Sequence, residues 1–162
     1  MQDNRRSVYW DASVWLSYIN ENPDRLPTLE AILADSSKPD GTIRLYTSVI
    51  SQVEVAFTVS EQAGGILDPE AEQKIDRLWA DRNVLDLIEV HQEIYTEART
   101  LIRVAMTNGW SLRGMDALHL ATAKWFGVDE IHTYDQKWKQ YEAVVGIRIL
   151  EPYIPQPRMP GV

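Results

Sequence analysis

Short apolar runs alternate along the chain with longer segments of helical periodicity. The short runs predict five strands, at residues 8–10, 43–47, 84–88, 130–134 and 147–150. Apolar residues spaced three and four apart predict helices at 12–19, 24–34, 69–79, 92–107 and 115–126, and a short helix at 137–141. Strands that alternate with helices predict an α/β fold, a three-layer α/β/α sandwich around a five-stranded, mostly parallel sheet.

The segment 49–59 fits both periods. Its valines and Phe57 alternate with polar or small residues, as in a strand, whereas Val49, Ile50, Val53 and Phe57 also fit helical spacing. Periodicity leaves both interpretations open. If the segment is helical, Glu54 intrudes on its apolar face, where a charge is costly unless it is paired or binds a metal.

Several bulky side chains fall on apolar faces of the predicted helices. Trp15, Trp79 and Trp125 are therefore expected in the core. His119 lies in a helix whose apolar residues surround it almost completely, so we expect it to be packed and hydrogen-bonded rather than catalytic. The apolar stripe of the helix at 92–107 is also predicted to face the core: Ile94, Ala98, Leu101, Ile102 and Ala105.

The length of 162 residues suits one domain, predicted at residues 1–151, followed by a proline-rich tail at 152–162. The absence of cysteine excludes disulfides, thiol catalysis and cysteine-ligated metal sites. No apolar run is long enough for a signal-peptide core or a membrane span. We therefore expect a cytoplasmic protein with no membrane association.

The net charge of −8, from 24 acidic and 16 basic residues, argues weakly against a nucleic-acid partner. An acidic total is also compatible with a cluster of carboxylates that binds divalent cations, and such a loaded site attracts phosphate. The sign of the charge therefore does not decide the partner.

Three aspartates stand where α/β proteins place their ligands. Asp11 and Asp135 follow predicted strands, and Asp116 opens the helix at 115–126. Because the carboxyl ends of parallel strands share one edge of the sheet, these carboxylates and Glu54 are expected to converge there. Each also has a simpler explanation, since aspartate at a helix start commonly caps the helix. Converging carboxylates repel one another unless Mg²⁺ or Mn²⁺ neutralises them.

Four short segments, in this order, resemble the PIN-domain nucleases, and within them the single-domain toxins of the VapC type. They are Asp11-Ala12-Ser13, Ser51-Gln52-Val53-Glu54, Arg113-Gly114-Met115-Asp116-Ala117-Leu118-His119-Leu120-Ala121-Thr122-Ala123, and Thr133-Tyr134-Asp135 followed by Trp138. The segments span essentially the whole chain. The sequence departs from the family pattern in having Trp138 where Phe is more usual and in its proline-rich tail.

The resemblance implies a helical segment around Glu54 and an acidic quartet for catalysis and metal binding, formed by Asp11, Glu54, Asp116 and Asp135. Ser13 and Thr133 become supporting polar groups, by orienting carboxylates or binding phosphate. The implied activity is Mg²⁺- or Mn²⁺-dependent hydrolysis of single-stranded or loop RNA that leaves a 5′-phosphate. The implied partners are RNA, a VapB-like antitoxin and a second copy of the chain in a homodimer.

Two other functions stay open at this point: a PIN-fold binding module whose acidic metal site is not catalytic, and an RNA-processing nuclease without an antitoxin. A phosphatase that uses Asp11 as nucleophile is disfavoured because Ser13 stands where a second aspartate is needed. Trp110, Arg113 and Trp138 are candidates for RNA contact, since they lie close to the proposed acids in sequence.

Overall fold

The computed structural model describes residues 3–156 of the chain. Five strands form one parallel sheet in the order β3-β2-β1-β4-β5. They are β1 (Arg6–Trp10), β2 (Ile43–Ser48), β3 (Leu85–Ile88), β4 (Glu130–His132) and β5 (Arg148–Leu150). The predicted α/β fold with a five-stranded parallel sheet is confirmed.

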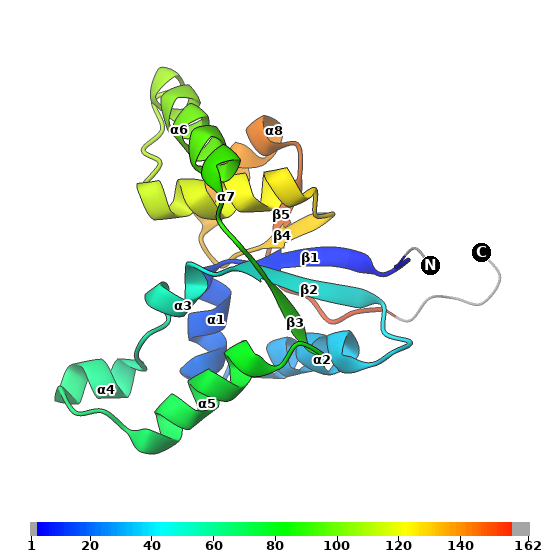
Figure 1. Cartoon of the computed structure of the whole chain (residues 1–162), viewed down its shortest axis with the longest axis vertical. Helices are drawn as coiled ribbons and strands as arrows, with labels where there is room; N and C mark the ends of the chain where they lie inside the picture. The colour runs from blue at the N-terminus through cyan, green and yellow to red at the C-terminus, as the bar shows by residue number, and fades with distance from the viewer. Residues whose placement is uncertain (1–2, 157–162) are drawn as a thin grey trace.

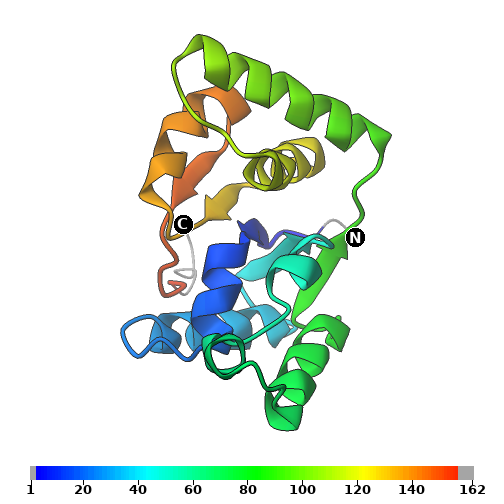
Figure 2. The same cartoon turned by 90° about the vertical axis from the view of Figure 1, so that its left-hand side faces the viewer.

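Helices cover both faces of this sheet, as Figures 1 and 2 show. One layer contains α1 (Ala12–Ile19), α2 (Leu26–Ser37) and α5 (Pro69–Ala80). The other contains α6 (Gln92–Thr107), α7 (Gly114–Phe126) and α8 (Glu142–Val145). The remaining helices are short: α3 (Ser51–Glu54), α4 (Val59–Gly64) and the 3₁₀ helix η1 (Gln136–Tyr141).

The central strand β1 divides the apolar core into two. Val8 and Trp10 pack on the side of α1, α2 and α5, whereas Tyr9 packs on the side of α6 and α7. All three side chains are fully buried, because a parallel strand covered on both faces needs apolar side chains in both directions. Asp11 follows at once, so the chain passes from the core directly to a carboxylate at the sheet edge.

The segment 49–59 is neither a strand nor one helix. It forms the single turn α3, breaks at Val55, whose side chain is buried, and starts α4 at Thr58, which forms a capping box with Glu61. The helical interpretation around Glu54 is thus confirmed, although the helix is shorter than its apolar spacing indicates.

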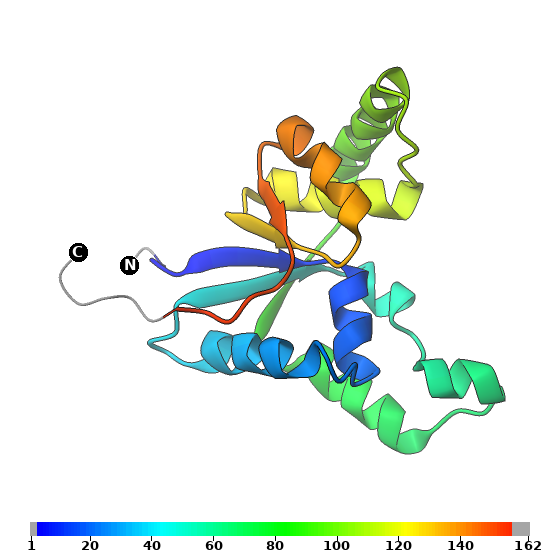
Figure 3. The same cartoon turned by 180° about the vertical axis from the view of Figure 1, so that it is seen from behind.

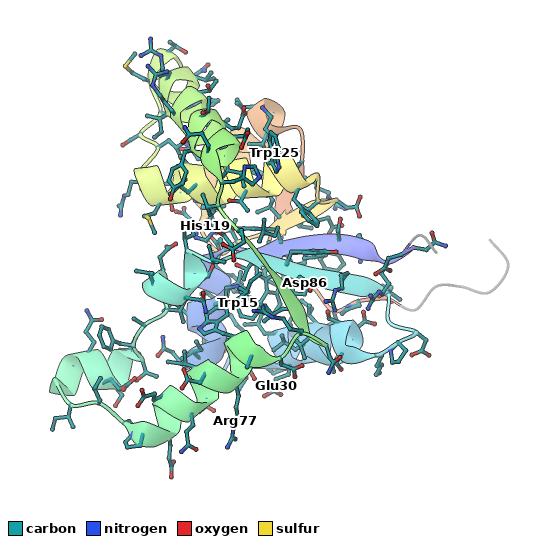
Figure 4. All side chains as sticks on the ribbon, in the orientation of Figure 1. Trp15, Glu30, Arg77, Asp86, His119 and Trp125 are labelled. Atoms are coloured by element: carbon teal, nitrogen blue, oxygen red, sulfur yellow. The ribbon has the colours of Figure 1, made fainter. Side chains whose placement is uncertain are left out.

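Three details of the sequence-based predictions are wrong. Helix α2 continues to Ser37, although the sequence predicted that it ends at residue 34. Trp125 is 54% exposed and Ile102 is 38% exposed, although both were expected in the core. Trp15, which is labelled in Figure 4, and Trp79 are buried as predicted, and the ring of Trp15 contacts that of Trp10. Periodicity places a residue on a helix face but does not show how far the neighbouring layer extends over that face.

The strand order creates a topological switch point between β1 and β4. From β1 the chain moves outward through β2 to β3, and then returns to place β4 on the other side of β1. In open α/β sheets, ligands bind at the carboxyl ends of the two strands that flank such a point. The residues that follow β1 and β4 include Asp11, Thr133 and Asp135.

The segment after β5 folds back along the sheet (Figure 3). The Tyr153 hydroxyl donates to the buried carboxylate of Glu130, 2.9 Å away, and the Tyr153 ring lies 5.5 Å from that of His132. Residues 152–156 have no regular secondary structure, and residues 157–162 of the predicted tail lie outside the described residues. The domain boundary at residue 151 stays a prediction. In the described range, no helix is long and apolar enough to cross a membrane.

The contacts of Glu130 predict a pH-dependent stability. Burial lowers the pKa of His132. Burial opposes ionisation of Glu130, but hydrogen bonds from His132 and Tyr153 and the charge of Arg6 outweigh it and lower its pKa. Both groups therefore bind protons more readily in the unfolded chain, so we expect stability to fall as the pH drops through about 6.5 and then about 4.3. Thermal melts recorded at pH values above, between and below these two values test this expectation.

The Glu130→Gln variant tests the part of this pH dependence that is assigned to Glu130. It removes the carboxylate whose pKa is lowered, so its melting temperature should depend less on pH below about 5. Glu89→Gln changes an exposed carboxylate and serves as the control. Parallel pH profiles for the wild type and Glu130→Gln would contradict the assignment.

Candidate functional site

Asp11 stands at the start of α1 with both carboxylate oxygens occupied. Its Oδ1 accepts from the Ser13 hydroxyl at 2.6 Å and from the backbone N–H of Val14 at 3.3 Å, so it caps the helix. Its Oδ2 accepts from the Thr133 hydroxyl at 2.6 Å. Asp11 is 4% exposed, and burial raises its pKa against the opposing hydrogen bonds of Ser13 and Thr133.

Thr133 connects the two strand-end aspartates. Its hydroxyl donates to Asp11 and accepts from the backbone N–H of Asp135 at 3.0 Å. Ser13 strengthens the same link, because its hydroxyl accepts from the backbone N–H of Tyr134 at 3.0 Å. The structure therefore brings both predicted supporting residues into contact with Asp11.

Asp116 differs from the other two aspartates because it caps nothing. It lies in the first turn of α7, but no backbone N–H or side chain in residues 3–156 donates a hydrogen bond to its carboxylate. Burial raises its pKa, and the charges of Asp135 and Glu54 add to this effect against the opposing charges of His119 and Arg113. The carboxylate of Asp116 is thus half-buried, has no hydrogen-bond donor within residues 3–156, and is repelled by its acidic neighbours. Asp135, by contrast, caps η1 by accepting from the Lys137 backbone.

A buried histidine holds Glu54 in place. Nε2 of His119 lies 2.5 Å from Oε1 of Glu54, and Nδ1 lies 2.6 Å from the hydroxyl of Tyr9. Because the carboxylate of Glu54 only accepts hydrogen bonds, Nε2 carries a proton and donates to Oε1. Burial raises the pKa of Tyr9, so its hydroxyl stays protonated beside Nδ1. His119, labelled in Figure 4, is packed and hydrogen-bonded as predicted, but the sequence did not reveal that it joins β1, α7 and α3.

Removing the hydroxyl of Tyr9 tests this chain of hydrogen bonds. Tyr9→Phe leaves Nδ1 of His119 buried without its hydrogen-bond partner, so we expect a loss of about 1–3 kcal/mol of unfolding free energy. Tyr95→Phe removes an equivalent hydroxyl from a side chain that is 51% exposed, and it should have little effect. Urea unfolding of both variants measures the difference, and equal stabilities would rule out the contact.

Two neighbouring pockets meet at Asp116. The first, called the Glu54 pocket, has a volume of about 780 Å³, and the second, called the Asp135 pocket, about 220 Å³. The Glu54 pocket is lined by Glu54, Tyr95, Ala98, Arg99, Ile102, Arg103, Arg113, Gly114, Met115, Asp116 and Leu118. The Asp135 pocket is lined by Ser111, Arg113, Asp116, Asp135, Lys137, Trp138 and Tyr141. Asp116 and Arg113 border both.

The carboxylate oxygens of these acidic side chains are the type of ligand that hard divalent cations prefer. Among the described residues, no three acidic or histidine side chains are already gathered as a set of metal ligands. Mg²⁺, however, is commonly held by one or two carboxylates, with water and substrate phosphate completing its shell. Asp116 shares one pocket with Asp135 and the other with Glu54, and a cation there would relieve the repulsion that raises its pKa. Asp11 lines neither pocket and joins the site through Thr133.

The candidates for RNA contact differ in exposure. Arg113 is exposed and lies between the two pockets, and Trp110 is half-buried. Trp138 is 2% exposed and packs beneath the Asp135 pocket near His119, which leaves little ring surface for a base. The sequence did not indicate Arg99 and Arg103 as candidates for RNA contact, because they line the Glu54 pocket only when α6 and α7 are packed together.

Comparison with known protein families gives a decisive match. The PIN domain family matches residues 8–144, which covers most of the chain. The chain belongs to the PIN domain family. The resemblance inferred from the four acidic segments is thereby confirmed. A comparison with curated proteins found no match.

Solved structures share this PIN fold at low sequence identity. VapBC2 from Rickettsia felis, bound to a DNA fragment from its promoter, has a TM-score of 0.66 and 17% identity, covering 91% of this chain and 98% of that chain. The sarcin-ricin loop cleaving toxin VapC20 of Mycobacterium tuberculosis has a TM-score of 0.61 and 18% identity, covering 82% and 93%. FitAcB from Neisseria gonorrhoeae has a TM-score of 0.59 and 16% identity, covering 90% and 97%.

Proposed function

We propose that this PIN domain is a metal-dependent endoribonuclease that hydrolyses phosphodiester bonds in single-stranded or loop RNA. The observation that carries the proposal is the carboxylate of Asp116, which has no hydrogen-bond donor within residues 3–156 and shares one pocket with Asp135 and the other with Glu54. Membership of the PIN family supports the same chemistry. A carboxylate that is half-buried, unpaired and repelled by its neighbours is suited to a cation and not to a structural role.

The four acids have different tasks in this proposal. Asp116 and Asp135 would hold Mg²⁺ or Mn²⁺ directly, and Glu54 would add a ligand or a water contact. Asp11 completes the acidic quartet, with its orientation fixed by Ser13 and Thr133. When bound, the cation supplies Lewis acidity toward a phosphate oxygen and activates water at neutral pH.

We also propose that the protein is the toxin of a type II toxin–antitoxin pair in the cytoplasm. The structures that share its fold include VapBC2 and FitAcB, complexes of the kind expected for such a pair. A VapB-like antitoxin is then the partner, and a homodimer is the expected assembly. A short reading frame that overlaps or precedes the gene would support this pairing, and its absence would favour an RNA-processing nuclease without an antitoxin.

A cleavage assay tests the enzymatic proposal. The purified protein should cut single-stranded RNA in the presence of Mg²⁺ or Mn²⁺, leave 5′-phosphate ends and lose this activity in EDTA. Its expression should inhibit growth, and Asp11→Asn should relieve that inhibition. Failure to cleave RNA with either metal, together with unchanged growth inhibition by Asp11→Asn, would refute the proposal.

One observation favours a second candidate, a binding module with an acidic site that is not catalytic. Asp11 and Asp135 both serve as helix caps, which gives each a structural role without metal. Calorimetric titration with Mn²⁺ separates the two functions: a purely structural set of acids should bind little metal, whereas the nuclease site should bind it and lose binding in Asp135→Asn.

A further inference from the structure

The Glu54 pocket carries positive charge along the side formed by α6. Arg99 and Arg103 lie four residues apart, and so on one face of the helix, and both line the pocket. Arg113 joins them at the start of α7, where the Glu54 pocket meets the Asp135 pocket. Lys137 continues the positive charge into the Asp135 pocket. Cationic side chains therefore flank Asp116 on both sides.

In the described part of the chain, these cations form no close ion pair with the acidic side chains that line the same pockets. Within residues 3–156, the charged groups of Arg99, Arg103, Arg113 and Lys137 form no ion pair and no hydrogen bond. Lys124, on the neighbouring helix α7, shows the contrast, because it pairs with Glu97 at 2.5 Å. In a chain with a net charge of −8, these four cations form a local concentration of positive charge. Adjacent guanidinium groups repel each other, and an anionic partner removes that repulsion.

Three apolar side chains in the lining of the Glu54 pocket are exposed. Tyr95 is 51% exposed, Ile102 38% and Met115 39%, and all three border the Glu54 pocket. Tyr95, Arg99 and Ile102 follow one another along α6 at spacings of four and three, and Arg103 comes directly after Ile102, so apolar and cationic side chains share this side of the helix. A partner that suits this lining carries negative charge at intervals and presents flat apolar groups between them. Single-stranded RNA has this chemistry, with phosphates for arginines and bases for aromatic or aliphatic surfaces.

We propose that the Glu54 pocket binds the RNA strand on one side of the bond that is cut, with phosphates on Arg99 and Arg103 and bases against Tyr95 and Ile102. Arg113, at the junction of the two pockets, contacts the phosphate next to Asp116. The inference rests on the proposed nuclease function and extends it, because it assigns the substrate a direction along α6. It also explains how an acidic protein binds a polyanion: the positive charge is concentrated where the strand lies.

A charge-matched pair of double variants tests the assignment. Arg99→Gln/Arg103→Gln removes two charges from the pocket, and Arg77→Gln/Arg82→Gln removes two exposed charges elsewhere that form no ion pair with any described residue. In Figure 4, Arg77 on α5 points away from the sheet, on the opposite side from α6. Binding of a short fluorescently labelled single-stranded RNA is measured by anisotropy in EDTA from about 50 to 200 mM salt. Cleavage of the same RNA with Mn²⁺ supplies KM and kcat.

The pocket variant should bind RNA at least about tenfold more weakly at low salt, and its slope of log affinity against log salt should fall by about 1.4, because two phosphate contacts are lost. Its KM should rise while kcat stays within about twofold, and the control variant should match the wild type. If the wild type binds and cleaves RNA and both double variants behave alike, the pocket assignment is overturned and the nuclease function stands. If the wild type neither binds nor cleaves RNA, both fail.

Discussion

Asp116→Asn is expected to lower kcat/KM for RNA cleavage by about a thousandfold or more, equivalent to about 4 kcal/mol of transition-state stabilisation. Asparagine keeps the shape of the side chain but removes the charge that holds a divalent cation. Within residues 3–156 this carboxylate accepts no hydrogen bond that the substitution would remove, so we expect no loss of stability. The effect should therefore appear in activity and metal binding without loss of stability.

The melting temperature of Asp116→Asn provides a second measurement, independent of RNA cleavage. Burial and the charges of Asp135 and Glu54 raise the pKa of Asp116, so its ionised form weakens the fold of the metal-free protein. A raised carboxyl pKa means that the folded chain binds the proton more tightly, and stability falls as the pH rises through the titration. In EDTA at neutral pH, Asp116→Asn should thus melt above the wild type, and the difference should vanish in acid. Added Mn²⁺ should raise the melting temperature of the wild type alone.

Asp40→Asn is the matched control for this prediction. Asp40 is exposed in the loop that precedes β2, at the amino end of the sheet. The substitution Asp40→Asn therefore removes the same charge far from the pockets. It should cleave RNA and respond to Mn²⁺ like the wild type. Equal activity in Asp116→Asn and Asp40→Asn would remove Asp116 from the site.

The sheet and the position of the acidic edge follow from local patterns. Apolar runs that end at Asp11 and near Asp135 indicate both the buried strands and the groups at their carboxyl ends. These features depend on residues close together in the chain, which is why periodicity and strand ends were enough. The one-turn helix at Glu54 was ambiguous because its conformation depends on the packing of Val55 and the cap at Thr58, and not on a repeating pattern.

The contacts inside the site depend on residues far apart in sequence. Glu54 meets His119, 65 positions away, and His119 meets Tyr9, 110 positions away. A single sequence does not show such pairs, because each residue alone looks like ordinary core. The same holds for Trp125 and Ile102, whose exposure is decided by where the layer of α6 and α7 ends. The residue types at the site could therefore be predicted from the sequence, whereas the contacts between them depend on how the helices pack.

Thr133→Val is expected to cost about 2 kcal/mol of unfolding free energy and to lower metal affinity and cleavage by about 10- to 100-fold. Valine has nearly the shape of threonine but lacks the hydroxyl that donates to Oδ2 of Asp11 at 2.6 Å. The carboxylate of Asp11, 4% exposed, would then lose one of its partners where water cannot replace it. The backbone N–H of Asp135 would lose its acceptor in the same step. One substitution thus loosens two members of the acidic quartet without removing a charge.

Thr122→Val separates this positioning role from the general cost of losing a buried hydroxyl. Thr122 is fully buried in α7, and its hydroxyl donates only to the carbonyl of Leu118 within the same helix. The control should therefore keep its Mn²⁺ affinity and its kcat, because a bond within one helix holds no acid in place. If Thr133→Val loses stability but binds Mn²⁺ as tightly as Thr122→Val, then Thr133 supports the fold alone. If metal affinity falls only in Thr133→Val, the hydroxyl sets the geometry of Asp11 and Asp135, and the two strand ends act as one site.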